Sequence, residues 1–226
     1  MSCKPSGAFG PVFLRICLGL IFVWAGLGKV LTTTTVTGSD VTLLKEMGVT
    51  PKTATVAGAT GTPKAADSNE LEVSNAYLLA LSLKKAAVPV EAEGGGKMQL
   101  WPDALAKGRL PVYAAYACVL TELLGGALVL LGAITRLCAF GLACTMLVAM
   151  WLTQFGPAIQ SGKTVLGFLP AHADALRADW QPLMLQFSLF SAAMALVFLG
   201  CGCLGVDRVL FGKSGGSPKP KAEPAQ

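Results

Sequence analysis

The stretch VLTELLGGALVLLGAITR, residues 119–136, decides the fold of this chain. Its apolar residues suit lipid, but Glu122 lies inside the stretch and Arg136 closes it. Helix is the expected state, because an isolated strand in lipid would leave its backbone groups unpaired. The stretch therefore predicts a transmembrane helix that holds a carboxylate at a depth where water is scarce.

Runs of similar character occur in three other places along the chain. Hydrophobic residues make up 53% of the 226 residues and charged residues only 14%, whereas a soluble domain has about 25% charged residues. A helix crosses the hydrocarbon with about 20 residues, and every apolar run reaches that length. The chain is thus predicted to be all-α, a bundle of four transmembrane helices at residues 11–31, 112–134, 137–155 and 183–206.

The first run, which forms residues 1–31 together with the N-terminus, has a second interpretation as a cleaved signal peptide. Basic residues precede its apolar core, and Gly26-Leu27-Gly28 is a poor small-x-small cleavage site. The length of the run and Lys29 directly after that site favour a retained helix. An intact-mass measurement distinguishes the two interpretations.

The charge distribution predicts how the spans are oriented. If the N-terminus is cytoplasmic, the whole net charge of +5 lies on that side, because residues 32–111 and residues 156–182 are each neutral. This asymmetry follows the positive-inside rule. It predicts a multi-pass protein of the bacterial cytoplasmic (inner) membrane, with both termini cytoplasmic and both neutral segments outside. Residues 207–226 are expected to be a basic, disordered cytoplasmic tail.

Residues 32–111 form a long extracytoplasmic insertion between the first two helices, and we expect it to be partly flexible. A short helix is predicted from Ser39 to a stop at Gly48. An amphipathic helix is predicted from Ser68 or Asn69 to the residue before Pro89. A further helix start is expected at Pro102, with Trp101 at headgroup depth.

Several classes of site are excluded or disfavoured. His172 is the only histidine and the chain has no C-x-x-C, so histidine-rich metal sites, bis-histidine haem and a dithiol motif are not expected, and no metal is predicted. GPAIQSGKT, residues 156–164, has five residues between its glycines where a P-loop has four. No basic surface with interleaved aromatic residues suggests nucleic acid. The cysteines of GCGC, residues 200–203, are interpreted as helix-packing residues.

Glu122 remains the residue most in need of explanation. A central charge costs about 2.5–3.5 kcal/mol on insertion, so such a residue is expected to face the bundle interior and to serve a function. Lys29 is the obvious partner, although straight helices place the two about 6–12 Å apart in depth. Two alternatives stay open: Glu122 only tethers helices by pairing, or Lys29 extends to the outer interface by itself.

Two further groups of residues are predicted to organise the bundle. Three charged residues fall near one depth on the inner side, where a structural clasp between helix ends is the favoured interpretation. Three glycines are expected to let neighbouring helices approach closely. The inner-face charge cluster is Arg15, Arg136 and Asp207, and the helix-packing glycines are Gly125, Gly126 and Gly132.

These residues also carry a family resemblance. LRICLGLIFVWAGLGKV resembles the opening signature of the DoxX family, and TELLGGALVLLGAITR resembles its second-span signature. LGCGCLGVDRVL is similar to the usual family ending, a fourth span that runs into an acidic residue. The resemblance implies a four-helix membrane protein associated with redox enzymes, as in quinone-linked subunits of thiosulfate oxidation and in complexes with sulfurtransferases or superoxide-handling enzymes.

Three functions are consistent with these observations. The first is a small membrane subunit or anchor for a quinone- or sulfur-linked redox enzyme, in which Glu122 and Lys29 form a buried polar site at a quinone or in a proton relay. The second is a structural membrane protein in which both charges only lock helices. The third is a transporter of protons or small solutes, which the absence of repeat symmetry disfavours. Besides the lipid bilayer, we expect a redox enzyme partner or a homo-oligomer.

Overall fold

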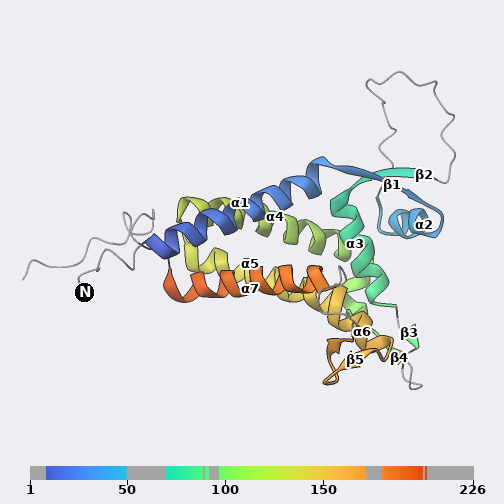
Figure 1. The fold of residues 1–226 in the computed structure, drawn as a ribbon. Helices are drawn as coiled ribbons and strands as arrows, with labels where there is room; N and C mark the ends of the chain where they lie inside the picture. The colour runs from blue at the N-terminus through green and yellow to red at the C-terminus, as the bar shows by residue number, and fades with distance from the viewer. Residues whose placement is uncertain are drawn as a thin grey trace, which may run out of the picture.

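A computed structural model describes residues 9–49, 70–88, 90–91, 97–171, 180–200 and 202. Within them, four helical segments are long and apolar enough to cross a membrane, which confirms the predicted all-α bundle. Figure 1 shows them lying roughly side by side along one axis. They are α1 (Phe9–Leu31), α4 (Leu110–Leu131), the continuous run of α5 (Thr135–Met150), η3 (Trp151–Phe155) and α6 (Gly156–Gln160), and α7 (Gln181–Leu199).

The ends of two spans differ from those predicted. The third run continues as helix to Gln160, although a loop was predicted from residue 156, because η3 is one turn of π-helix that joins α5 to α6 without a break. The fourth helix ends at Leu199 rather than 206. Gly200 follows with φ 77°, a left-handed conformation that stops a helix. The predicted tail, residues 207–226, lies outside the described residues.

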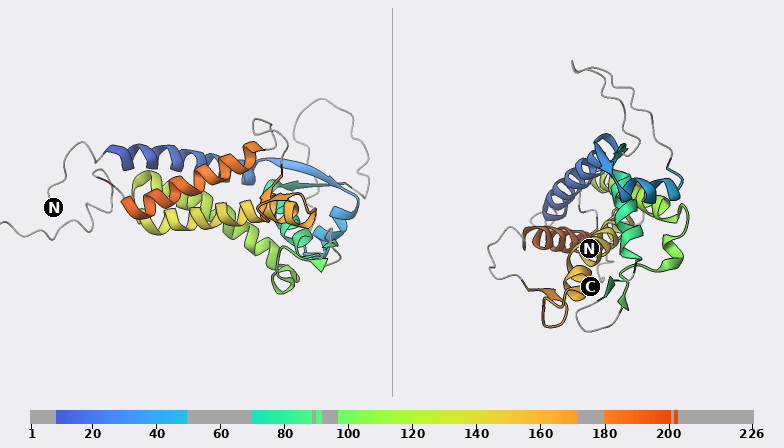
Figure 2. Two further views of the ribbon diagram at one scale, coloured as in Figure 1. Left: turned by 60° about the horizontal axis from the view of Figure 1, so that its bottom comes forward. Right: turned by 90° about the vertical axis from the view of Figure 1, so that its right-hand side faces the viewer.

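The helices pack as two antiparallel pairs, α1 with α4 and α5 with α7, and α4 also contacts α5. Helices α1 and α7 meet over a shorter stretch. The right-hand view of Figure 2 looks at the bundle from the cap end. The shared core lies toward the N-terminal half of α1. It consists of Leu18, Phe22, Val129, Ala139, Leu142, Ala143, Met146, Ala193 and Leu196.

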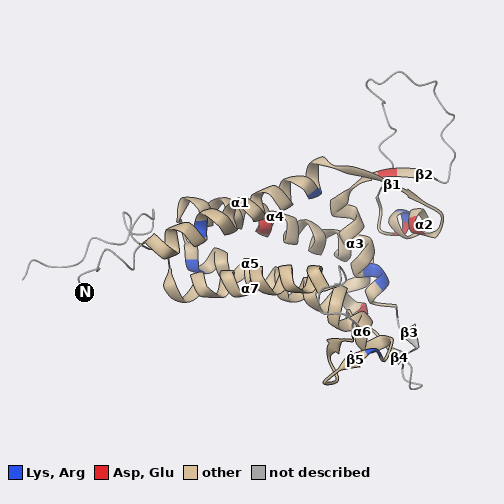
Figure 3. Cartoon of the chain, viewed as in Figure 1, with Lys and Arg blue, Asp and Glu red and all other residues tan. Residues whose placement is uncertain are grey.

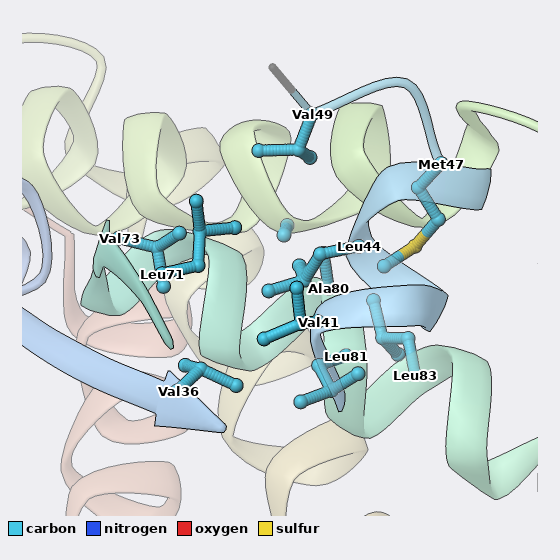
Figure 4. Packing of buried hydrophobic residues seen from close by; sticks show 11 residues of the cluster. Val36, Val41, Leu44, Met47, Val49, Leu71, Val73, Ala80, Leu81 and Leu83 are labelled. Atoms are coloured by element: carbon cyan, nitrogen blue, oxygen red, sulfur yellow. The ribbon is translucent and has the colours of Figure 1, made fainter. Parts of the chain in front are cut away.

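The segment between α1 and α4 folds over the other end of the bundle. We call its two-stranded sheet and two helices the cap: β1 (Thr33–Thr37), α2 (Ser39–Glu46), β2 (Glu70–Ser74) and α3 (Asn75–Ala86). The cap has its own apolar core, which Figure 4 shows from close by. Ala115 of α4 belongs to the same cluster of buried residues. After the cap come β3 (Val90–Glu91), paired with β4 (Lys97–Met98), and the 3-10 turn η2 (Asp103–Ala106).

The strands of the cap were not predicted, and they correct the expected helix from residue 68 or 69. Residues 70–74 are β2, antiparallel to β1 with Thr35 opposite Glu72, so the helix begins only at Asn75. The sequence ELEVS alternates polar and apolar residues, a strand period, and both Leu71 and Val73 enter the core. The predicted helix after Ser39 is present as α2, with Gly38 at its N-cap.

Contacts from α3 and from residues 97–101 attach the segment between α1 and α4 to the bundle. The rings of Tyr77 in α3 and Tyr116 in α4 pack edge to face at 5.6 Å. Their side-chain hydrogen bond and partial burial raise the pKa of Tyr77 above its ordinary value. On the other pair, Trp151 donates a hydrogen bond to the carbonyl oxygen of Leu100 at 3.0 Å. The start of α4 therefore lies at the level of the cap.

Candidate functional site

The close approach of α1 and α4 is made by glycines on both helices. A Cβ atom on Gly19 would lie 2.9 Å from the carbonyl oxygen of Gly126, and one on Gly126 would lie 3.0 Å from the backbone nitrogen of Val23. At Gly26 the backbone nitrogen of Leu123 would be 3.1 Å away. These distances leave no room for a side chain, so the two backbones pack directly on each other.

Lys29 and Glu122 form an ion pair across this helix contact. The Lys29 Nζ donates hydrogen bonds to Glu122 Oε1 at 2.6 Å and to Oε2 at 2.5 Å. Figure 3 shows the basic residue near the end of α1 and the acidic residue well inside α4. The Glu122 side chain is 2% exposed, whereas the Lys29 side chain is 33% exposed. The predicted interior position of Glu122 and its predicted partner are both present.

The depth difference estimated from the sequence disappears for a specific reason. Ala115 is buried in the core of the cap, so the first turns of α4 stand beyond the end of α1 rather than beside it. Glu122, three turns into α4, thereby comes level with Lys29 in the last turn of α1. The sequence estimate did not include this extension of α4 beyond the end of α1.

A thiol completes the immediate surroundings of the carboxylate. Cys118 lies one turn before Glu122 on the same face of α4, and its Sγ is 3.8 Å from Glu122 Oε1. The sequence analysis did not include Cys118 in the site, although the spacing of four residues in a helix places the two side chains together. Among the described residues, no group of three or more His, Cys, Asp or Glu side chains lies close enough to hold a metal ion.

The two arginines of the predicted inner-face cluster bind helix ends. Arg15 is 3% exposed, and it donates from Nε to the carbonyl oxygen of Val129 at 3.0 Å and from Nη2 to that of Leu130 at 3.1 Å. Arg136 donates to the carbonyl oxygen of Phe198 at 3.4 Å. Each guanidinium therefore caps the C-terminal carbonyls of a neighbouring helix. Asp207, the third member, lies outside the described residues.

The three predicted packing glycines occupy three different positions. Gly126 faces α1, and Gly125 faces α5, where an added Cβ would lie at an ordinary 3.5 Å from Leu142. Gly132 ends α4 with φ 73°, and a Cβ there would lie 2.5 Å from the guanidinium carbon of Arg15. Gly19 and Gly26 were missed as packing residues, although both share one α1 face with Arg15 and Lys29, at successive spacings of four, seven and three residues.

Comparison with known proteins gives one match. No curated protein and no solved structure matches the chain. The family model of DoxX matches residues 93–154, a segment that runs from just before β4 to η3. The matched segment contains Glu122, the paired glycines beside it and Arg136, while Lys29 and Arg15 lie before it. The match covers about a quarter of the chain and supports membership of the DoxX family, and the four apolar helices agree with a membrane protein.

Proposed function

We propose that the chain is a small membrane subunit of a quinone- or sulfur-linked redox enzyme complex, with Lys29 and Glu122 as its buried polar site. Family membership supports the association with redox enzymes, as the sequence resemblance implies. The observation that carries the proposal is the asymmetric burial of the ion pair, with a buried carboxylate and a partly exposed ammonium. Charged residues inside membrane spans mark pathways of ions, protons or substrates more often than they serve packing alone.

The ammonium has hydrogen-bonding capacity beyond the ion pair. A lysine ammonium has three N–H donors, and two hydrogen bonds go to the oxygens of Glu122. Since a third of the Lys29 side chain is exposed, the remaining donor has access to a ligand in the membrane. Quinone carbonyl oxygens are hydrogen-bond acceptors on an apolar ring, so the donor set and the apolar surroundings fit such a headgroup.

In this proposal Lys29 binds and orients the quinone carbonyl, and Glu122 holds Lys29 in place. Glu122 is also the acidic group of the spans nearest to that position, so it is the residue that accepts or releases a proton there. Quinone, when bound, supplies the transfer of electrons and protons between the partner enzyme and the membrane pool. Burial of Glu122 keeps bulk water away from the carboxylate oxygens.

The orientation in the inner membrane is part of the same proposal. The neutral segments outside and the net charge of +5 on the other side follow the positive-inside rule. In this orientation the cap and the Lys29 end of the bundle face away from the cytoplasm. Labelling of Ser39→Cys in intact cells by a membrane-impermeant maleimide tests the orientation, and labelling only after lysis would overturn it.

Native co-purification in mild detergent tests the proposed complex. We expect a redox enzyme to accompany the chain, and quinone-linked activity of that complex to fall with Glu122→Gln and Lys29→Met. Glu46→Gln is the matched control, because this exposed carboxylate belongs to the cap. Unchanged activity in both site variants would refute the role of the pair, and recovery of only homo-oligomers would refute the partner.

A structural role is the second candidate, and one observation favours it specifically. Both oxygens of Glu122 are engaged by Lys29, next to a backbone contact that already fixes the helices. If the pair only locks helices, Lys29→Met combined with Glu122→Gln restores the stability that either single change loses, and activity of the complex persists. The redox proposal expects restored stability without restored activity.

A further inference from the structure

The short hairpin between the third and fourth spans presents apolar side chains to its surroundings. Strands β5 (Thr164–Val165) and β6 (Leu169–Pro170) pair antiparallel, with Val165 opposite Leu169. At its tip Leu166 is 80% exposed, and more than half of Val165 and of Phe168 is exposed. Three large apolar side chains thus stand together on a turn of four residues, where polar residues are the usual choice.

The backbone conformation of the turn is unfavourable for a leucine. The loop between the paired Val165 and Leu169 has three residues, and its first two, Leu166 with φ 57° and Gly167 with φ 82°, adopt the left-handed conformation. Glycine adopts a positive φ readily, whereas a leucine is strained there. Strain of this kind persists where the side chain has a role at its position. Within the described part of the protein, the exposed side chain of Leu166 has no such role.

The position of the hairpin suggests what its tip contacts. The hairpin follows directly on α6, the end of the third span, and the ring of Phe168 packs against that of Phe155 in η3 with centroids 6.3 Å apart. Its base is closed by a hydrogen bond from the Ala171 nitrogen to the Lys163 carbonyl oxygen at 2.8 Å. Figure 1 shows the hairpin next to α6 at the cap end of the bundle, on the side away from α2, β1 and β2.

We infer that the tip of this hairpin, residues 165–168, inserts into the interfacial layer of the lipid bilayer. The exposed apolar tip lies close to the end of the third span in the sequence, and exposed Lys163 at its base suits the lipid phosphates. Three side chains offer far less than the roughly 800 Å² that a stable protein interface buries on each partner. Lipid, in contrast, surrounds the spans from which the hairpin emerges.

A fluorescent label at the tip tests this inference directly. An environment-sensitive fluorophore is attached to Leu166→Cys, in a chain whose seven native cysteines are replaced by alanine or serine. In vesicles of phosphatidylcholine and phosphatidylglycerol, we expect emission at shorter wavelength than for the control label at Ser39→Cys in the cap. Nitroxide lipids labelled about 5–10 Å below the headgroups should quench it more than lipids labelled at the chain ends.

A second variant keeps the test decisive if the cysteine-free chain does not fold. Leu166→Trp in the otherwise native chain should show a loss of fluorescence with brominated lipids that exceeds the loss of the parent chain with its four tryptophans. Emission at residue 166 equal to that of the cap label, with quenching by aqueous iodide, would overturn the inference. A shift that depends on the protein-to-lipid ratio and is insensitive to quenching lipids would also overturn it, because it would show a contact between proteins.

Discussion

The two helix pairs of the bundle are held by different means. Helices α1 and α4 meet backbone to backbone at glycines and enclose an ion pair. Helices α5 and α7 meet through alanine, leucine and methionine side chains. The polar contacts of this second pair are exposed: Arg136 donates to the carbonyl oxygen of Phe198 at 3.4 Å, and Gln186 of α7 donates to Thr153 of η3 at 3.2 Å. The pair that contains the charges is thus the pair whose backbones approach most closely.

This difference shows what a membrane protein needs in order to hold a charge. Lipid tails are as apolar as leucine, so helices in a bilayer associate through close packing and hydrogen bonds rather than through the hydrophobic effect. Close packing at Gly19, Gly26 and Gly126 excludes lipid from one side of the ion pair. In the α5–α7 pair, where no charge is buried between the helices among the described residues, side-chain packing is sufficient.

The largest expected effect comes from filling the glycine contact. Gly126→Leu should destabilise the protein by about 3 kcal/mol or more, because overpacking here pushes on backbone atoms of α1. The measurement is unfolding in mixed micelles with increasing dodecyl sulfate. Gly28→Leu is the matched control, since a Cβ at Gly28 meets nothing within 4 Å.

Gly125, which neighbours Gly126 but faces α5, provides a second comparison. Gly125→Ala should be neutral or slightly stabilising, because its Cβ meets Leu142 at an ordinary distance and alanine favours helix. Equal losses for Gly126→Leu and Gly28→Leu would show that the α1–α4 contact is not as close as described.

The second expected effect concerns the ion pair. Breaking a buried pair costs about 3–5 kcal/mol, and we expect about 2 kcal/mol for Lys29→Met because a third of Lys29 is exposed. The loss should shrink when Glu122→Gln is added, since the carboxylate is then no longer left unpaired. Additive losses in the double variant, measured by the same unfolding assay, would argue against the pair.

The third effect compares the two arginine caps. Arg15→Gln should cost about 1.5 kcal/mol, the lower range for hydrogen bonds from a charged group, because its guanidinium is buried against the end of α4. Arg136→Gln should cost clearly less, because its 3.4 Å hydrogen bond to the end of α7 is exposed. Thermal unfolding in detergent measures both, and a larger loss for Arg136→Gln would reverse the ranking of the two pairs.

The smallest effect is expected on the polar contact of the second pair. Gln186→Leu should cost about 0.6 kcal/mol, the average for a hydrogen bond between membrane helices. Thr153→Val, which removes the partner hydroxyl, should give a similar loss and little more in combination. A loss as large as that of Lys29→Met would mean that both pairs depend equally on polar contacts.

Much of the bundle and part of the site followed from the sequence. Four runs of spanning length and the cost of a charge in lipid are local properties, so the helices and the interior position of Glu122 were predictable. The identity of Lys29 as partner followed because few charged residues occur within the spans. The face that links Arg15, Gly19, Gly26 and Lys29 was readable from spacing alone and was missed.

Other features depend on contacts that a linear pattern does not contain. The level of Glu122 relative to Lys29 depends on the burial of Ala115 in the cap. Strand β1 reads as a run of threonines until β2 pairs with it across 32 intervening residues. The π-helical turn at residues 151–155 brings Gly156 against Leu100, a contact made between distant segments.

The separation of the paired charges along the chain has a consequence for the order of assembly. Lys29 and Glu122 are 93 residues apart, and at about 5–20 residues per second the ribosome needs about 5–20 s to make that length. During this interval α1 waits in the bilayer without its partner helix. The strands and helices of the cap emerge in the meantime and have most of their core partners among themselves. We therefore expect the cap to form first. Insertion of α4 then completes both the core of the cap and the core of the bundle.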